Sequence, residues 1–109
     1  MPETTIAEAK NVTVPLKANI YFDGKVVSHT LLDPQGGKRT IGLIYPGTFN
    51  FSTGAPERMD ILAGACRVRL KGATEWKNYA AGSFFKVPGN SAFDITVEQG
   101  LAEYLCTFE

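Results

Sequence analysis

Side chains that could perform covalent or metal chemistry are few in this chain of 109 residues. His29 is the single histidine, and the two cysteines, Cys66 and Cys106, lie far apart in apolar segments. This spacing fits neither a multi-histidine metal site nor a zinc ribbon. The sequence also shows no nucleophile and base pair and no glycine-rich loop with the spacing of a P-loop. Any catalysis must therefore rest on the positioning and electrostatics of polar side chains.

The overall charge is balanced, with 11 Lys and Arg residues against 11 Asp and Glu residues. A protein that coats nucleic acid or a membrane surface would carry a basic excess, so neither partner is expected. No apolar run approaches roughly 20 residues, the length that spans a bilayer. The first residues lack the basic and apolar regions of a signal peptide, and both cysteines are expected to be reduced, so we expect a cytoplasmic protein.

The pattern of elements predicts an all-β fold, either an antiparallel β-barrel or a jelly roll. Residues 1–18 are expected to form an N-terminal extension, with a possible edge strand at 11–16, and residues 19–109 the single domain. Alternation and turn signals every 8 to 12 residues predict eight or nine short strands, at 25–32, 40–45, 48–53, 59–63, 66–71, 75–79, 83–87, 92–97 and 103–108. A deep site is difficult to build from one small subunit, so a homodimer is expected.

Two glycine and proline patterns resemble the motifs of the cupin superfamily. Gly82 is followed after five residues by Pro88-Gly89, and Glu57 is followed after six residues by Gly64. This resemblance implies a small β-barrel of six to ten strands. Metal-binding cupins place histidines just before the motif glutamate and after the motif proline. Here those regions hold Phe51, Thr53, Asn90 and Ser91, so no metal site is expected.

A longer series of landmarks resembles the pyrimidine/purine nucleoside phosphorylase family of small cupins. The series covers about residues 19–108 and consists of Asn19–Phe22, Gly24-Lys25-Val26, Phe51-Ser52-Thr53-x-x-Pro56-Glu57-x-Met59, Trp76, Gly82-Ser83-x-Phe85-x-Val87-Pro88-Gly89-x-Ser91-x-Phe93 and Tyr104-Leu105-Cys106. The resemblance implies that purine and pyrimidine nucleosides are cleaved with inorganic phosphate to free base and pentose 1-phosphate. It implies no cofactor, with phosphate as the co-substrate. Many family members carry histidine where this chain has Asn90, which leaves the role of that position open.

The implied reaction needs a site that binds phosphate, polar groups that hold the sugar and a surface on which the leaving base stacks. Arg39 opens a predicted strand after the Gly36-Gly37 turn, and together with Ser52 or Thr53 it could cradle phosphate, or it could be a solvated arginine beside the turn. Glu57 could accept the ribose hydroxyls or polarise the substrate, or lie as a surface carboxylate in a loop. Arg58 is a second phosphate candidate, ranked below Arg39 because alternation points it away from Met59.

The predicted binding surface is mostly aromatic. Phe51, Tyr79 and Phe93 could stack a base, although aromatic residues that face a barrel interior are more often plain core. Met59 could line the floor of the pocket or only pack in the core. A cupin that binds a small molecule without turning it over is the alternative function, and a barrel filled with side chains is a third.

Overall fold

The computed structural model describes residues 6–109. The elements along the chain are β1 (Asn19–Tyr21), the short helical turn η1 (Phe22–Gly24), β2 (Val26–Leu32), β3 (Lys38–Ile44), β4 (Gly47–Ser52), β5 (Glu57–Ala63), β6 (Ala65–Leu70), β7 (Lys77–Ala80), β8 (Phe84–Val87), β9 (Ala92–Val97) and β10 (Ala102–Phe108). The part of the chain from residue 6 onward contains no helix long and apolar enough to cross a membrane.

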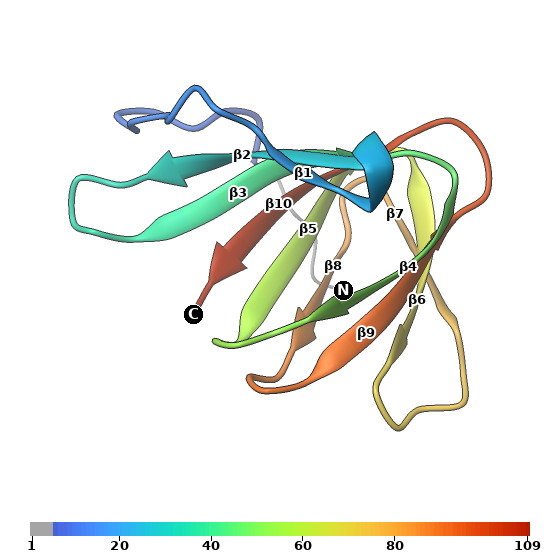
Figure 1. Ribbon diagram of the computed structural model, residues 1–109. Coiled ribbons are helices and arrows are strands. Elements are labelled where there is room, and N and C mark those ends of the chain that lie inside the picture. Colours follow the sequence, from blue (N-terminus) through green and yellow to red (C-terminus); the bar gives the residue numbers. More distant parts are fainter. Residues whose placement is uncertain (1–5) are drawn as a thin grey trace.

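The strands form two antiparallel sheets that face each other (Figure 1). One sheet has six strands in the order β1-β2-β3-β10-β5-β8, and the other has four in the order β4-β9-β6-β7. β10 lies in the middle of the larger sheet and pairs with β3 on one side and β5 on the other. The all-β fold expected from the sequence is confirmed, as a jelly-roll-like sandwich whose two sheets are not closed into one barrel.

Several strand boundaries in the structure differ from those expected from the sequence. Glu57 is the first residue of β5 and is partly buried, so it is not in a loop. The strand expected at 75–79 begins only after Trp76, and the edge strand expected at 11–16 is reduced to a single bridge in which Thr13 and Leu32 exchange two backbone hydrogen bonds of 2.9 and 2.8 Å. Residues 1–5 of the expected extension lie outside the described residues, and the division at residue 18 stays a prediction.

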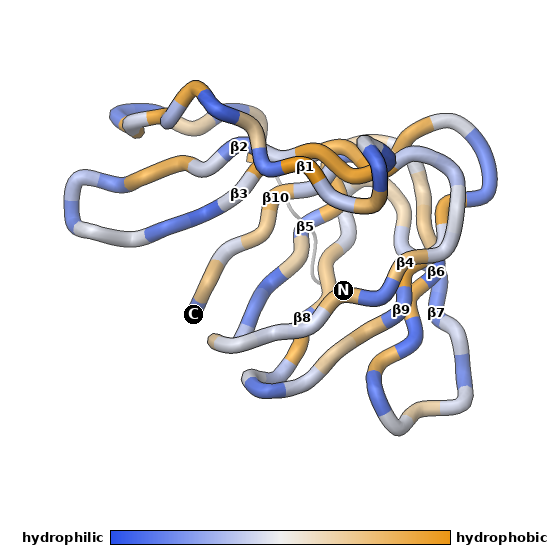
Figure 2. The backbone as a smooth tube through the Cα atoms, viewed as in Figure 1, coloured by the Kyte–Doolittle hydropathy of each residue, from blue (hydrophilic) through white to orange (hydrophobic). Residues whose placement is uncertain are grey.

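Alternation along the strands builds the core between the sheets. In β9, Phe93, Ile95 and Val97 are buried, whereas the residues between them are only partly buried. Figure 2 shows that hydrophilic residues concentrate in the turns, such as the one between β2 and β3. Full burial of a side chain such as Ile95 stabilises the fold by about 1.5–3 kcal/mol. Cys66 belongs to this core as a free thiol, and burial raises its pKa to about 11, so it stays protonated at neutral pH.

Gly64 is the single residue that joins β5 to β6. Its backbone has a φ of +77°, a conformation that side chains with a Cβ rarely adopt. A Cβ at this position would also collide with the carbonyl oxygen of Leu101. The tight connection between the two sheets therefore requires glycine here.

We expect Gly64→Ala to lower the free energy of unfolding by about 3 kcal/mol or more, because strain and collision add together. Gly72→Ala is the matched control, since Gly72 has a φ of +84° but open space around the point where a Cβ would stand. The control should lose only about 1–2 kcal/mol, the cost of the left-handed conformation. Urea denaturation of both variants measures the difference, and equal losses would refute the collision.

Candidate functional site

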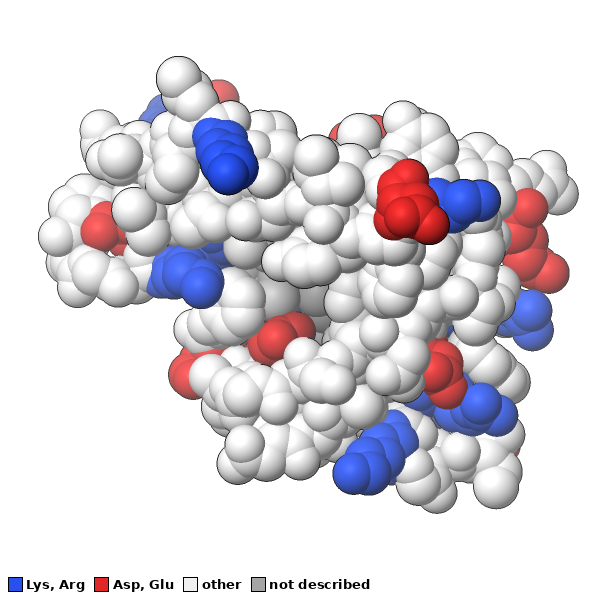
Figure 3. All heavy atoms as spheres, in the orientation of Figure 1, with Lys and Arg blue, Asp and Glu red and all other residues white. Residues whose placement is uncertain are grey.

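A cavity of about 440 Å³ lies between the two sheets. Strands β2, β3, β5 and β10 of the larger sheet line one side, and β4, β9 and the turn η1 line the other. Figure 3 shows this face hollowed, with an acidic side chain at the edge of the hollow. The volume lies in the range of small-molecule sites.

The wall formed by the smaller sheet is aromatic. Phe51 of β4 lies opposite Phe93 of β9 in the strand register, and their rings stack with centroids 5.5 Å apart and planes 22° apart. Phe22 of η1 meets Phe51 edge to face at 5.5 Å and is 42% exposed. An aromatic surface therefore reaches from the core to the mouth of the cavity, where a planar ring can stack.

The wall formed by the larger sheet carries hydroxyl groups. Gly42 of β3 lies between Ser28 and Tyr104 in the register. Because Gly42 has no side chain, the Tyr104 ring lies over it, with the hydroxyl 2.8 Å from where a Cβ would stand. The Tyr104 hydroxyl is hydrogen-bonded to Ser28, and burial raises the pKa of Tyr104 to about 12. Asn19 donates to Ser28 Oγ at 3.2 Å, which fixes this hydroxyl pair at the side of the cavity.

Glu57 brings a carboxylate to the same wall. The Cys106 thiol donates to Glu57 Oε1 at 3.5 Å, and burial raises the pKa of Glu57 above its ordinary value. Burial, together with the nearby Glu57 charge, also raises the pKa of Cys106 far above its ordinary value, so the sulfur stays a hydrogen-bond donor. Within residues 6–109, Glu57 forms no ion pair, which leaves its oxygens able to accept hydrogen bonds from a ligand.

The structure brings five of the eight predicted site residues to this cavity, namely Phe51, Ser52, Glu57, Met59 and Phe93. Met59 is 4% exposed and serves both the core and the cavity floor, so the two interpretations given for it coincide. Their roles in binding or catalysis stay predictions.

Arg39 lies outside the cavity. The next residue, Thr40, lines the cavity, so strand alternation turns Arg39 to the outer face of the sheet. There its guanidinium forms a 2.9 Å ion pair with Asp33. The position of this side chain does not support the phosphate contact predicted for it.

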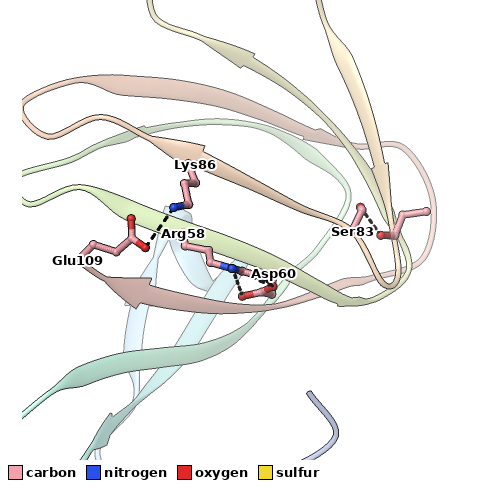
Figure 4. A network of polar contacts seen from close by, with 6 residues as sticks. Arg58, Asp60, Ser83, Lys86 and Glu109 are labelled. Atoms are coloured by element: carbon pink, nitrogen blue, oxygen red, sulfur yellow. Dashed lines mark hydrogen bonds and ion pairs between the residues drawn. The ribbon is translucent and has the colours of Figure 1, made fainter. Parts of the chain in front are cut away.

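Arg58 also points to the outer face, where it is engaged (Figure 4). Its guanidinium donates to both carboxylate oxygens of Asp60, at 3.2 and 3.3 Å, and lies 3.8 Å from the centroid of the Phe84 ring. Asp60 is only 1% exposed, so removal of Arg58 would leave a buried charge without a partner. This arginine stabilises the sheet and is not free to hold an anion.

Tyr79 lies on the far side of the core. Its ring packs against Phe85 with centroids 4.9 Å apart. It borders a second cavity of about 470 Å³ on the outer side of β6 and β7, together with Arg67 and Glu98, which form a 3.5 Å ion pair. A base stacked in the first cavity would not meet Tyr79.

Thr53 lies beside the cavity and holds a neighbouring turn. Its hydroxyl donates to the Pro88 carbonyl oxygen at 2.7 Å and accepts from the Ser91 backbone N–H at 2.9 Å. The Asn90 N–H donates to the Gly54 carbonyl oxygen at 3.0 Å, and Asn90 has a φ of +51°, a conformation that asparagine tolerates better than most residues. Thr53 and Asn90 therefore fix the loop that borders the mouth.

The sequence reasoning missed several cavity residues. Tyr104 and Cys106 stand two apart in the last predicted strand, so alternation alone could have placed them on one face. Ser28 and Thr40 could not be found in this way, because only the register of β2 with β3 brings their strands together. Among the described residues, no three His, Cys, Asp or Glu side chains gather into a potential metal site.

Comparison with known proteins identifies similar chains over almost the whole length. The sequence model of the pyrimidine/purine nucleoside phosphorylase family matches residues 16–108. A protein named pyrimidine/purine nucleoside phosphorylase from Methylobacillus flagellatus is 56% identical over 104 residues, covering 95% of this chain and 100% of the relative. A protein of the same name from Cupriavidus necator is 54% identical, covering 94% of this chain and 97% of the relative.

Solved structures agree with this similarity. A crystal structure of a protein of unknown function from Acinetobacter sp. ADP1 is 41% identical, with a TM-score of 0.91, covering 94% of this chain and 98% of the other. A second such protein, from Vibrio parahaemolyticus, is 36% identical with a TM-score of 0.81, covering 89% of this chain and 99% of the other.

We expect Thr53→Val to lower the free energy of unfolding by about 1–3 kcal/mol, because it removes the buried hydroxyl that bonds both the Pro88 carbonyl oxygen and the Ser91 N–H. Thr48→Val in β4 is the control, since the Thr48 hydroxyl is exposed and is hydrogen-bonded to the Thr96 hydroxyl at 2.9 Å. It should change stability by less than about 0.5 kcal/mol. Denaturant titrations measure both, and an unchanged stability of Thr53→Val would show that the turn does not depend on this hydroxyl.

Proposed function

The chain belongs to the pyrimidine/purine nucleoside phosphorylase family, and we propose that its cavity is where nucleosides are cleaved with phosphate to free base and pentose 1-phosphate. The proposal rests on the observation that two chemically different walls face each other across the cavity. One wall offers stacked aromatic rings, and the other offers hydroxyl groups and the Glu57 carboxylate. A nucleoside has the matching halves, a flat base and a polyhydroxylated sugar.

The aromatic wall supports a broad range of bases. Phe22, Phe51 and Phe93 offer stacking surfaces, and stacking does not depend on the hydrogen-bonding groups at the edge of a base. Asn50, the amide at this wall, already donates to Asp94 at 2.9 Å. Purines and pyrimidines can therefore share one site at the expense of selectivity.

The polar wall supports the sugar and the reaction. Glu57 accepts hydrogen bonds from the ribose hydroxyls, and the hydroxyls of Ser28, Thr40 and Tyr104 lie along the same wall. In the reaction an oxygen of phosphate bonds to C1′ while the C1′–N bond breaks. The bonding pair leaves with the base, which takes up the proton that phosphate gives up. The pentosyl group is thereby transferred to phosphate, and the proposal needs no resident cofactor.

We also propose that the protein is a homodimer. The outer face of the first three strands carries exposed apolar side chains, with Ile20 65% and Ile41 42% exposed. A contiguous apolar surface on a small protein commonly marks a contact with another chain. Sedimentation of the wild type and of Ile20→Lys tests the proposal. The wild type should sediment as a dimer and Ile20→Lys as a monomer, and a monomeric wild type would end the proposal.

The buried free thiols of Cys66 and Cys106 fit the reducing cytoplasm, which remains the proposed location.

The function is tested by incubating the purified protein with uridine or adenosine, with and without inorganic phosphate, and measuring free base. We expect release only when phosphate is present, together with an equal amount of pentose 1-phosphate. Release without phosphate would indicate hydrolysis. Binding of the nucleoside without release would indicate a non-catalytic binding protein.

The pH profile tests Glu57. Its carboxylate must be ionised to accept two sugar hydroxyls, and burial raises its pKa. We therefore expect kcat/KM to fall as the pH is lowered, with a midpoint above that of an ordinary glutamate. Glu57→Gln should lose this acidic limb and about 10- to 100-fold in kcat/KM. An unchanged profile in the variant would remove Glu57 from the reaction.

Stability should respond to the same group with the opposite sign. Because the pKa of Glu57 is higher in the folded than in the unfolded chain, the folded protein binds more protons between the two pKa values. Its stability therefore falls as the pH rises through that interval. Glu57→Gln should remove this part of the pH dependence, as measured by denaturant titrations at a series of pH values.

A further inference from the structure

Lys38, the first residue of β3, lies on the inward-facing side of the strand, beside a residue that lines the cavity. It shares this side with Thr40 and Gly42, because side chains alternate along the strand. Its ammonium nitrogen is 4.8 Å from the centroid of the Phe108 ring, and Phe108 lines the cavity. The cationic group is thus directed to the mouth of the site.

The neighbouring cations are neutralised by carboxylates. Arg39 pairs with Asp33 and Arg58 pairs with Asp60, both on the outer face of the sheet. Lys38 makes no ion pair with any residue from 6 to 109. Its contact with Phe108 uses the face of a ring and leaves the three N–H donors of the ammonium unpaired with an anion.

Cys106 shows how close Lys38 lies to the polar wall. The Lys38 charge acts to lower the pKa of this thiol, whereas the Glu57 charge acts to raise it. The Thr40 hydroxyl is hydrogen-bonded to the same sulfur. A positive group, a hydroxyl donor and a carboxylate therefore surround one point of the wall, with Glu57 3.5 Å from the sulfur.

We propose that Lys38, with the Thr40 hydroxyl beside it, binds the inorganic phosphate at the mouth of the cavity. The inference rests on the proposed function, which requires an anion near the sugar. Phosphate carries one to two negative charges at neutral pH and would be repelled by Glu57 unless a cation lay on its other side. Lys38 supplies that cation. The Thr40 hydroxyl, at the next inward-facing position of the same strand, turns its proton from the Cys106 sulfur to the anion when phosphate binds, because a charged acceptor makes the stronger hydrogen bond.

The test compares Lys38→Met with the wild type. Methionine keeps an unbranched apolar stem over Phe108 and removes the charge. We expect the KM for phosphate to rise about tenfold or more while the KM for the nucleoside stays unchanged. Lys38→Arg should restore most of the phosphate affinity, because it restores the charge. Lys71→Met is the matched control, since Lys71 is exposed in the turn after β6 and lies outside the cavity, and it should leave both constants unchanged.

Calorimetric titration with inorganic phosphate adds a measurement that does not need turnover. Wild type and Lys71→Met should bind phosphate, and Lys38→Met should bind it about tenfold more weakly. The wild type should also lose affinity as salt is added, more steeply than Lys38→Met.

Failure of this inference differs from failure of the proposed function. A wild type that releases base with phosphate, and a Lys38→Met variant with an unchanged phosphate KM, would overturn the role of Lys38 alone. A wild type that releases no base would overturn the proposed function. Loss of phosphate binding in Lys38→Met would then still support the anion site, and equal binding, or no binding by either protein, would overturn it.

Discussion

The pairing of β10 with β3 on one side and β5 on the other decides which side chains face the cavity. In this register Cys106 lies between Thr40 and Met59, and Tyr104 lies opposite Gly42. A shift of one residue would turn every one of these side chains to the outer face. The polar wall, the position of Glu57 and the direction of Lys38 all depend on this single set of backbone hydrogen bonds.

The two sheets contribute opposite kinds of surface to one cavity. The smaller sheet presents Phe51 and Phe93, whose stacking buries both rings against the core. The larger sheet presents hydroxyls, a thiol and a carboxylate, and these groups satisfy one another through Ser28, Tyr104, Cys106 and Glu57. Partial burial lowers the local dielectric, which strengthens each polar contact and also raises the pKa of the acidic groups. The fold therefore holds polar groups in place before a ligand arrives, as catalysis by positioning requires.

Much of the fold could be predicted from the sequence, because most strands place apolar residues inward in simple alternation. The inward positions of Cys66, Val68, Phe93 and Ile95 follow directly from this pattern. β3 reverses it. Its inward residues include Lys38, Thr40 and Gly42, whereas Ile41 points outward and is 42% exposed. An apolar residue that faces solvent and a polar one that faces a cavity mislead any assignment by hydropathy. Arg39 was expected to reach into the cavity because it follows the Gly36-Gly37 turn and opens a strand, but strand alternation gives the inward-facing position to its neighbour Lys38.

The inverted hydropathy pattern of β3 also means that this strand contributes to both the cavity and the outer surface. One strand supplies Thr40 to the polar wall and Ile41 to the opposite side, so the two surfaces are separated by a single layer of backbone. Ile41 lies opposite His29 and Leu105 in the register, and Leu105 is 3% exposed. A partner that covered this face would hold β3 in its register, and the register in turn holds the direction of Lys38. The apolar outer face and the inward-facing side chains of Lys38 and Thr40 are therefore the two faces of one strand, and both depend on its register.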